Sequence, residues 1–291
     1  MSEPLFSVII PCFNEEGAIL DTLASLRKWL AEAGPYELIV VDDGSTDGTA
    51  AILASAEEAD ADLRVVRHPR NLGYGAALKT GIRRAEAPLI AITDADGTYP
   101  NDRLPELITR AADADMVVGA RIGEDVVYSK VRAVPKIVLR RYASWLSRVN
   151  IPDINSGMRV FRKDVAERFI KVLPDTFSFT TTITVAMLTN RYAVDFVPIS
   201  YAPRIGKSKI RPIRDTLKFV QLLIRTGMYF APMRVLMPVV LLLTGAFLAR
   251  LSYDVFVLMD LTEATMLLLL FALNTALFGL LADMIDKRSA G

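Results

Sequence analysis

The sequence predicts an α/β domain with a mostly parallel sheet, followed by a helical hairpin that spans a membrane. Three observations support this fold class. Short apolar runs alternate with helix-length segments in the first half of the chain, a polar cluster follows each run, and the C-terminal part is strongly apolar. Strands that alternate with helices imply right-handed crossovers, and such crossovers produce a mostly parallel sheet.

Short apolar runs of this length, bounded by polar and turn-forming residues, are typical of buried strands. The predicted strands cover residues 6–10, 38–41, 63–66, 89–92 and 116–118. Helices are predicted between them, near residues 16–32, 48–59, 75–85 and 101–112.

Each predicted strand is followed by an unusual polar cluster. The clusters are Pro11–Glu16, Asp42–Ser45, Asn71–Gly75, Asp94 with Asp96, and Gly119–Arg121. Parallel sheets bind ligands in the crevice beyond the carboxyl ends of their strands. The sequence therefore predicts an active site at this edge of the sheet.

Asp94 and Asp96 are the most informative pair in the chain. They leave the fourth predicted strand with one small residue between them, so both side chains can face one site. Mg²⁺ binds in this way, through one or two carboxylates and otherwise through phosphate oxygens and water. Asp42 and Asp43 have a second interpretation as caps of the next helix or of its turn, because the Ser45–Asp47 segment that follows them suits a helix N-terminus.

Several classes of site are disfavoured. Gly73-x-Gly75 lacks the further glycine of a phosphate loop, and no glycine follows the first strand, which argues against a nicotinamide or flavin enzyme. No P-loop sequence is present. The single cysteine, Cys12, cannot form an internal disulfide or a zinc cluster, and a net charge of +1 gives no argument for nucleic acid. His68, the only histidine, is expected to be a surface or structural residue, and no signal peptide is expected.

Three motifs together resemble family 2 glycosyltransferases, whose GT-A fold contains a Rossmann-like, mostly parallel sheet. The motifs are residues 7–16, residues 40–47 and Asp94-Ala-Asp96, and the similarity in order and spacing extends over residues 5–210. The resemblance implies an inverting enzyme that uses a nucleotide-diphosphate sugar with Mg²⁺ or Mn²⁺. It also implies donor-binding roles for Pro11, Phe13, Asn14, Glu15, Val41 and Asp43 at the base and ribose, and for Asp94, Ala95 and Asp96 at the ribose and metal-bound diphosphate.

The region after the predicted sheet is basic and amphipathic. Residues 130–149 mix lysine and arginine with valine, leucine, tyrosine and tryptophan, which is typical of a helix that lies in a membrane surface. A solvated helix packed on the domain is the alternative. Residues 204–214 form a second basic block, and residues 214–232 are predicted to form an amphipathic juxtamembrane helix.

Two apolar stretches predict membrane helices within residues 233–284. Residues 235–249 are uncharged but short for a bilayer, so either the flanking Arg234 and Arg250 extend toward the membrane surface or the span includes residues 228–233 as well. Residues 264–282 are long enough to span. Basic residues flank both outer ends and acidic residues dominate the connection, so the positive-inside rule places the domain, both termini and the tail 285–291 in the cytoplasm. A buried soluble hairpin is the alternative.

A lipid monophosphate is the predicted acceptor. A hydroxyl acceptor usually needs a general base, whereas a phosphate monoester is already anionic near neutral pH and needs cations instead. The predicted partners are therefore a nucleotide-diphosphate sugar, a lipid monophosphate and the bilayer, whereas assembly into a homo-oligomer is left open. The candidate cations for the acceptor phosphate are Arg121, Arg132, Lys136 and Arg204.

Further segments resemble the dolichyl- and polyprenyl-phosphate sugar synthases of this family. They are residues 153–162, Gly119-Ala-Arg121, and the segment from Arg204 to Lys209, which is similar to a hairpin that closes over the diphosphate and metal. By this resemblance the acceptor is a polyprenyl phosphate, whose phosphate Arg121 contacts. The donor is a UDP- or GDP-sugar, which Arg204 and Lys209 contact. Thr98 replaces a glutamine that many members place at the metal, so Thr98 or water would complete that shell. Residues 122–128 do not align, which affects the positions of Arg132 and Lys136.

Two alternatives remain from the sequence. The same fold could transfer sugar to a lipid or glycan hydroxyl, with Asp153 as the general base. The chain could instead be a non-catalytic membrane protein that assists a partner. The chain retains Asp94 and Asp96, the predicted metal ligands, and this disfavours the non-catalytic alternative.

Overall fold

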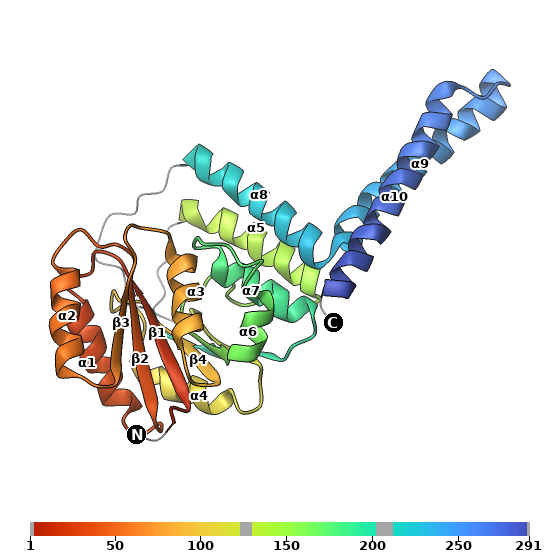
Figure 1. Cartoon of the computed structure of the whole chain (residues 1–291). Coiled ribbons are helices and arrows are strands. Elements are labelled where there is room, and N and C mark those ends of the chain that lie inside the picture. Colours follow the sequence, from red (N-terminus) through yellow and green to blue (C-terminus); the bar gives the residue numbers. More distant parts are fainter. Residues whose placement is uncertain (1–2, 123–129, 202–211, 290–291) are drawn as a thin grey trace. The chain divides into compact units, whose positions relative to one another are not determined.

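The computed structural model describes residues 3–122, 130–201 and 212–289 (Figure 1). Contacts divide the chain into two compact units, Met1–Ile210 and Arg211–Gly291. The first unit contains a seven-stranded sheet with helices, and the second contains long helices.

The first unit alternates strands and helices as the sequence predicts. Its strands are β1 (Phe6–Cys12), β2 (Tyr36–Asp42), β3 (Leu63–Arg67), β4 (Leu89–Ile92), β5 (Met116–Ala120), β6 (Arg159–Arg162) and β7 (Val194–Pro198). Its helices are α1 (Ile19–Leu30), α2 (Thr49–Ala59), α3 (Tyr74–Arg84), the short 3₁₀ helix η1 (Asn101–Arg103), α4 (Leu104–Arg110), α5 (Lys130–Ser147), α6 (Lys163–Phe169) and α7 (Phe179–Thr189). The five predicted strands are β1 to β5, and β6 and β7 are additional.

The sheet has the strand order β3-β2-β1-β4-β6-β5-β7. β1 pairs in parallel with β2 and β4, and β5 pairs in parallel with β7, whereas β6 runs antiparallel between β4 and β5. Because β6 is antiparallel to both β4 and β5, β4 and β5 run in the same direction. The carboxyl ends of β1 to β5 therefore share one edge, as predicted.

Helices cover both faces of the sheet, and alternate residues of one strand supply both cores. Val8 and Ile10 of β1 pack with α1, α2 and α4, whereas Ile9 packs with α3, α6 and α7. Side chains of a strand point alternately to its two faces, so a strand buried on both sides is apolar throughout. This pattern explains why the sequence shows continuous apolar runs.

The second unit is a helical hairpin preceded by an amphipathic helix. It comprises α8 (Pro212–Phe230), α9 (Pro232–Tyr253), a π-helical turn η2 (Asp254–Leu258) and α10 (Glu263–Ser289), with α9 and α10 packed side by side (Figure 1). The helical segments Pro232–Leu258 and Glu263–Ile285 are long and apolar enough to cross a membrane. Apolar side chains such as Leu242 and Phe278 are largely exposed on them.

The first apolar helix is longer than the 15-residue stretch that the sequence suggests. The helical segment covers 27 residues, about 40 Å at ~1.5 Å per residue, against a ~30 Å hydrocarbon core. Arg250 lies within it and forms an ion pair of 3.1 Å with Asp254, one turn further on. Asp254 also accepts hydrogen bonds from the hydroxyls of Thr262 and Thr265 at 2.6 Å each. Arg250, expected to flank the uncharged stretch, therefore lies inside a longer helical segment, where the buried carboxylate of Asp254 pairs with it.

Candidate active site

The loops after β1 and β2 are joined by hydrogen bonds. The Oδ1 atom of Asn14 accepts from the backbone N–H of Thr46 at 2.8 Å, and the Oγ atom of Ser45 accepts from the N–H of Asn14 at 3.0 Å. Asn14 adopts a left-handed conformation with φ 56°, which asparagine tolerates better than most residues. The neighbouring Phe13 side chain is 40% exposed, so its ring is available at this edge of the sheet.

Asp42 and Asp43 organise loops and do not cap α2, whose N-cap residue, Gly48, has no side-chain cap. Asp42 accepts from the N–H of Ser45 at 2.9 Å and forms an ion pair of 3.3 Å with Arg67. Asp43 accepts from the N–H groups of the Asn71–Gly75 cluster, at Leu72 and Gly73 (2.9 and 2.8 Å). Asp42 therefore caps the turn after β2, as the alternative interpretation allows, whereas neither aspartate caps the helix α2.

His68 has a structural role, in agreement with one of the two roles expected from the sequence. Its ring is buried, with Nδ1 2.7 Å from the Oδ1 atom of Asp43 and Nε2 3.0 Å from the hydroxyl of Thr80. A carboxylate only accepts, so Nδ1 carries the proton that it donates to Asp43. The histidine thus fixes the carboxylate predicted to lie at the donor base and ribose.

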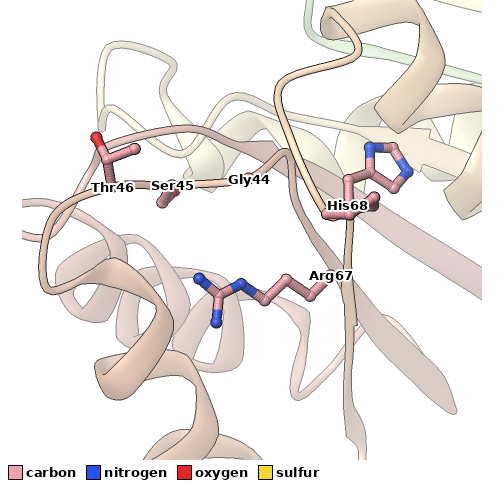
Figure 2. Close-up of a pocket in the computed structure, with 6 residues that line it drawn as sticks. Gly44, Ser45, Thr46, Arg67 and His68 are labelled. Carbon is pink, nitrogen blue, oxygen red and sulfur yellow. The ribbon is translucent and has the colours of Figure 1, made fainter.

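A hollow of about 400 Å³ lies at the ends of β2 and β3, and its lining residues are Gly44, Ser45, Thr46, Arg67, His68 and Pro69. Figure 2 shows the Arg67 guanidinium facing the Gly44–Thr46 loop, with the His68 ring turned away. Arg67 is not among the site residues predicted from the sequence. A signal was present, because Arg67 directly follows the third predicted strand, residues 63–66. Its position beside Asp42 depends on the register of the sheet.

The two aspartates after β4 are half-buried and held in place. The hydroxyl of Tyr74 donates to Oδ1 of Asp94 at 3.1 Å, and Gly157 lies so close that a Cβ there would be 3.0 Å from the same oxygen. Asp96 accepts at Oδ1 from the hydroxyl and the N–H of Thr98, at 2.7 and 3.2 Å. The carboxylate oxygens suit Mg²⁺ or Mn²⁺. Thr98 binds Asp96 and thereby orients it.

No group of three or more His, Cys, Asp or Glu side chains suited to a metal occurs among residues 3–122, 130–201 and 212–289. A metal at Asp94 and Asp96 would therefore rely on substrate oxygens and water for its other ligands. Mg²⁺ bound beside nucleotide phosphates commonly has such a shell. The pair fits a metal that binds together with the donor.

Arg121 forms a bidentate ion pair with Asp153. Its Nε and a terminal nitrogen donate to the two carboxylate oxygens at 2.7 and 3.1 Å, and both side chains are nearly buried. Burial by itself raises the pKa of Asp153, but the hydrogen bonds and charge of Arg121 outweigh it, so the pKa lies below its usual value. The guanidinium also lies over the ring of Tyr201, at 5.1 Å from its centre.

A short series of contacts joins this ion pair to the aspartates. Tyr201 packs edge-on against Tyr99, at 5.1 Å between ring centres, and the Tyr99 hydroxyl accepts from the N–H of Gly157 at 2.6 Å. Burial raises the pKa of Tyr99, the charge of Asp94 adds to this rise, and the charge of Arg121 opposes it. Both charges therefore act on one phenol. The structure thus brings Arg121 and Asp94 to the same site.

Arg159, within the segment that resembles the sugar synthases, is completely buried. It donates to the carbonyl oxygens of Ser156 and Thr180 and to the hydroxyl of Thr184. Burial lowers its pKa to about 10. Arg159 thereby fastens the loop before β6 to the first turns of α7, a structural role that the sequence does not reveal.

The other predicted cations are not placed by the structure. Arg204 and Lys209 lie outside the described residues. Arg132 and Lys136 lie on α5, in the part of that helix whose side chains are not described. Their predicted roles remain predictions.

Comparison with known proteins supports the family suggested by the motifs. Residues 7–170 match the family described as glycosyl transferase family 2, and residues 231–287 match the GtrB C-terminal hairpin. The chain is 33% identical over 219 residues to a polyprenol monophosphomannose synthase of Mycolicibacterium smegmatis, which covers 70% of this chain and 80% of the relative. It is 30% identical over 208 residues to a dolichyl-phosphate hexose transferase of Haloferax volcanii, covering 71% and 86%.

A third relative is longer. The low-salt glycan biosynthesis hexosyltransferase Agl6 of Haloferax volcanii is 29% identical over 231 residues, which cover 76% of this chain and 53% of that protein. Among solved structures, glucosyl-3-phosphoglycerate synthase from Mycobacterium tuberculosis has a TM-score of 0.57 at 20% identity, covering 77% of this chain and 79% of the other. That likeness establishes the fold. The chain belongs to glycosyl transferase family 2, as a glycosyltransferase of the GT-A fold with a C-terminal hairpin of the GtrB type.

Proposed function

We propose that the protein transfers a sugar from a nucleotide-diphosphate sugar to a polyprenyl monophosphate at the cytoplasmic face of a membrane, with inversion at the anomeric carbon. The observation that carries this proposal is Arg121, a cation that Asp153 fixes and that a series of contacts through Tyr201 and Tyr99 joins to the predicted metal aspartates. A fixed guanidinium is suited to a phosphate. The polyprenyl- and dolichyl-phosphate enzymes among the relatives support the same acceptor class.

The donor is proposed to lie across the ends of β1, β2 and β4. Its base and ribose would contact Phe13 and the loops held together by Asn14 and Asp43, next to the hollow that contains Arg67. Asp94 and Asp96 would hold Mg²⁺ or Mn²⁺. When bound, that cation would neutralise charge on the donor diphosphate. Whether the donor carries uridine or guanosine is left to experiment.

The acceptor chemistry requires no general base. An oxygen of the lipid phosphate forms a bond to the anomeric carbon, while the bond from that carbon to the nucleoside diphosphate breaks and its electron pair leaves with the diphosphate. Arg121 would hold the acceptor phosphate close to an anionic donor, so positioning and electrostatic stabilisation supply most of the effect. The lowered pKa of Asp153 makes this residue a weak base, which disfavours a hydroxyl acceptor.

Membrane association is proposed for both units. In the first unit, Val138, Arg141 and Trp145 are exposed on α5, and Arg148 is exposed just beyond the end of this helix. Such a mixture of apolar and basic side chains is suited to anionic lipid headgroups. In the second unit, the hairpin would span the bilayer. Its connection carries acidic residues and its outer flanks are basic, so the positive-inside rule places both ends in the cytoplasm.

The test is product formation from radiolabelled UDP- and GDP-sugars, polyprenyl phosphate and Mg²⁺ or Mn²⁺, with the detergent-solubilised full chain. We expect a chloroform-soluble labelled product that EDTA abolishes. Asp96→Ala should abolish transfer without changing the melting temperature, whereas Asp113→Ala, which removes an exposed carboxylate, should have no effect. Label transferred only to hydroxyl acceptors, or normal turnover by Asp96→Ala, would contradict the proposal.

A further inference from the structure

Phe177 is the most exposed large apolar side chain among the described residues of the first unit, with 76% of its surface accessible. It lies in the loop between α6 and α7, two residues before α7 begins. Single exposed apolar residues are common and need no function. This one differs because its loop is held firmly and its ring lies near the predicted metal site.

The Phe177 loop is packed directly against the start of α3. Gly73 and Gly75 touch the backbone carbonyls of Asp175 and Pro174 so closely that no Cβ would fit at either glycine. The N–H of Ala76 donates to the carbonyl of Asp175 at 3.2 Å. The loop therefore holds the phenylalanine in a defined position.

The Phe177 ring stacks on Tyr74, with 5.1 Å between ring centres and 17° between ring planes. The hydroxyl at the far end of Tyr74 donates to Oδ1 of Asp94 at 3.1 Å. One aromatic ring therefore separates the exposed phenylalanine from a predicted metal carboxylate. Leu72, which is 44% exposed, precedes the Gly73 backbone that touches this loop and adds apolar surface next to it.

We propose that Phe177, supported by Tyr74, contacts the isoprene units next to the phosphate of the lipid acceptor. The inference rests on the proposed function, because it assigns the acceptor chain of that same reaction. The phosphate must reach the anomeric carbon beside Asp94, so the first isoprene units lie close to that carboxylate. A phenyl ring provides apolar contact to them.

Two observations favour the lipid chain over the donor sugar as the occupant. The exposed ring has no hydrogen-bonding group, whereas sugar hydroxyls require polar partners when they are bound. In addition, α7 follows Phe177 directly and packs against α5, the helix whose exposed surface is proposed to contact the bilayer. The acceptor would arrive from that surface.

The test uses the full chain in detergent, with undecaprenyl phosphate as the varied substrate and the nucleotide sugar at a saturating concentration. Phe177→Ala should raise the KM for undecaprenyl phosphate about tenfold or more, since full burial of a phenylalanine side chain contributes about 1.5–3 kcal/mol and 1.4 kcal/mol is a factor of ten. Phe177→Leu should recover most of the affinity, and the KM for the donor should remain unchanged. Trp29→Ala, which removes an exposed aromatic ring from the far end of α1, is the matched control.

The outcomes separate this inference from the proposed function. If the wild type glycosylates undecaprenyl phosphate and Phe177→Ala leaves its KM unchanged, the inference is wrong and the proposed function stands. A rise in the donor KM alone would assign the ring to the sugar and also overturn the inference. If the wild type glycosylates no polyprenyl phosphate, the proposed function fails, and the inference fails with it.

Discussion

Replacing Arg121 by alanine leaves the carboxylate of Asp153 buried without its cation, because Asp153 is only 9% exposed. Breaking a buried ion pair by removing one partner costs about 3–5 kcal/mol. The slight exposure of both side chains favours the lower end, about 3 kcal/mol. For a domain of this size, we expect the melting temperature to fall by roughly 10 °C. Arg83→Ala, which removes an exposed arginine from α3, should change it little.

The loss of stability in Arg121→Ala should depend on pH, and the pKa of Asp153 determines the direction. In the wild type its pKa lies below the usual value, so the contribution of the pair is present above about pH 4 and is lost as the pH falls through the lowered pKa. In Arg121→Ala the charge and side-chain hydrogen bonds of the guanidinium are lost, so the pKa of Asp153 rises from its wild-type value, although the backbone N–H groups of residue 121 and Asn155 still donate to the carboxylate. Its penalty is then largest near neutral pH and is relieved as the carboxyl becomes protonated.

Melting temperatures of the detergent-solubilised variants between about pH 7 and about pH 4 would measure this effect. The gap between wild type and Arg121→Ala should narrow as the pH falls. The double variant Arg121→Ala with Asp153→Ala should recover most of the stability but retain a raised KM for polyprenyl phosphate. Equal melting temperatures for wild type and Arg121→Ala, or a gap that widens in acid, would refute the reasoning.

Two further substitutions test the supports of the predicted donor site. Thr98→Val removes the hydroxyl that donates to Asp96 and should raise the metal concentration for half-maximal activity about tenfold, the effect of one hydrogen bond to a charged group. Thr98→Ser should restore the metal dependence of the wild type. An unchanged metal titration in Thr98→Val would exclude a role of Thr98 in orienting Asp96. His68→Ala removes a support of Asp43 and should raise the donor KM while the acceptor KM stays constant. A normal donor KM would separate Asp43 from donor binding.

Much of the fold could be predicted because local patterns determine it. The runs that became β1, β2, β4 and β5 are apolar on both faces, and the helices between them carry apolar residues at helical spacing. Strand β6 could not be found in this way. It has four residues with arginine at both ends, and only its pairing between β4 and β5 makes it a strand.

The candidate site was predictable in its residue types and not in its pairings. The order of strands and loops placed Asp43, Asp94 and Asp96 at one edge. The sequence could not indicate that His68 binds Asp43 or that Asp153 binds Arg121 from 32 positions away. Such pairs form between distant loops, and no periodicity records them. The burial of Arg159 was hidden for a related reason, since arginine is almost never fully buried.

The Arg250–Asp254 pair bears on how the hairpin would enter a bilayer during synthesis. A lone arginine deep in an apolar helix opposes transfer from water to lipid, whereas a carboxylate one turn away forms a neutral unit with it. The remaining partners of Asp254, Thr262 and Thr265, belong to the connection and the second helix. The first helix alone therefore leaves Asp254 short of hydrogen-bond donors. Insertion of α9 and α10 together, as one folded hairpin, would bring the hydroxyls of Thr262 and Thr265 to the carboxylate of Asp254.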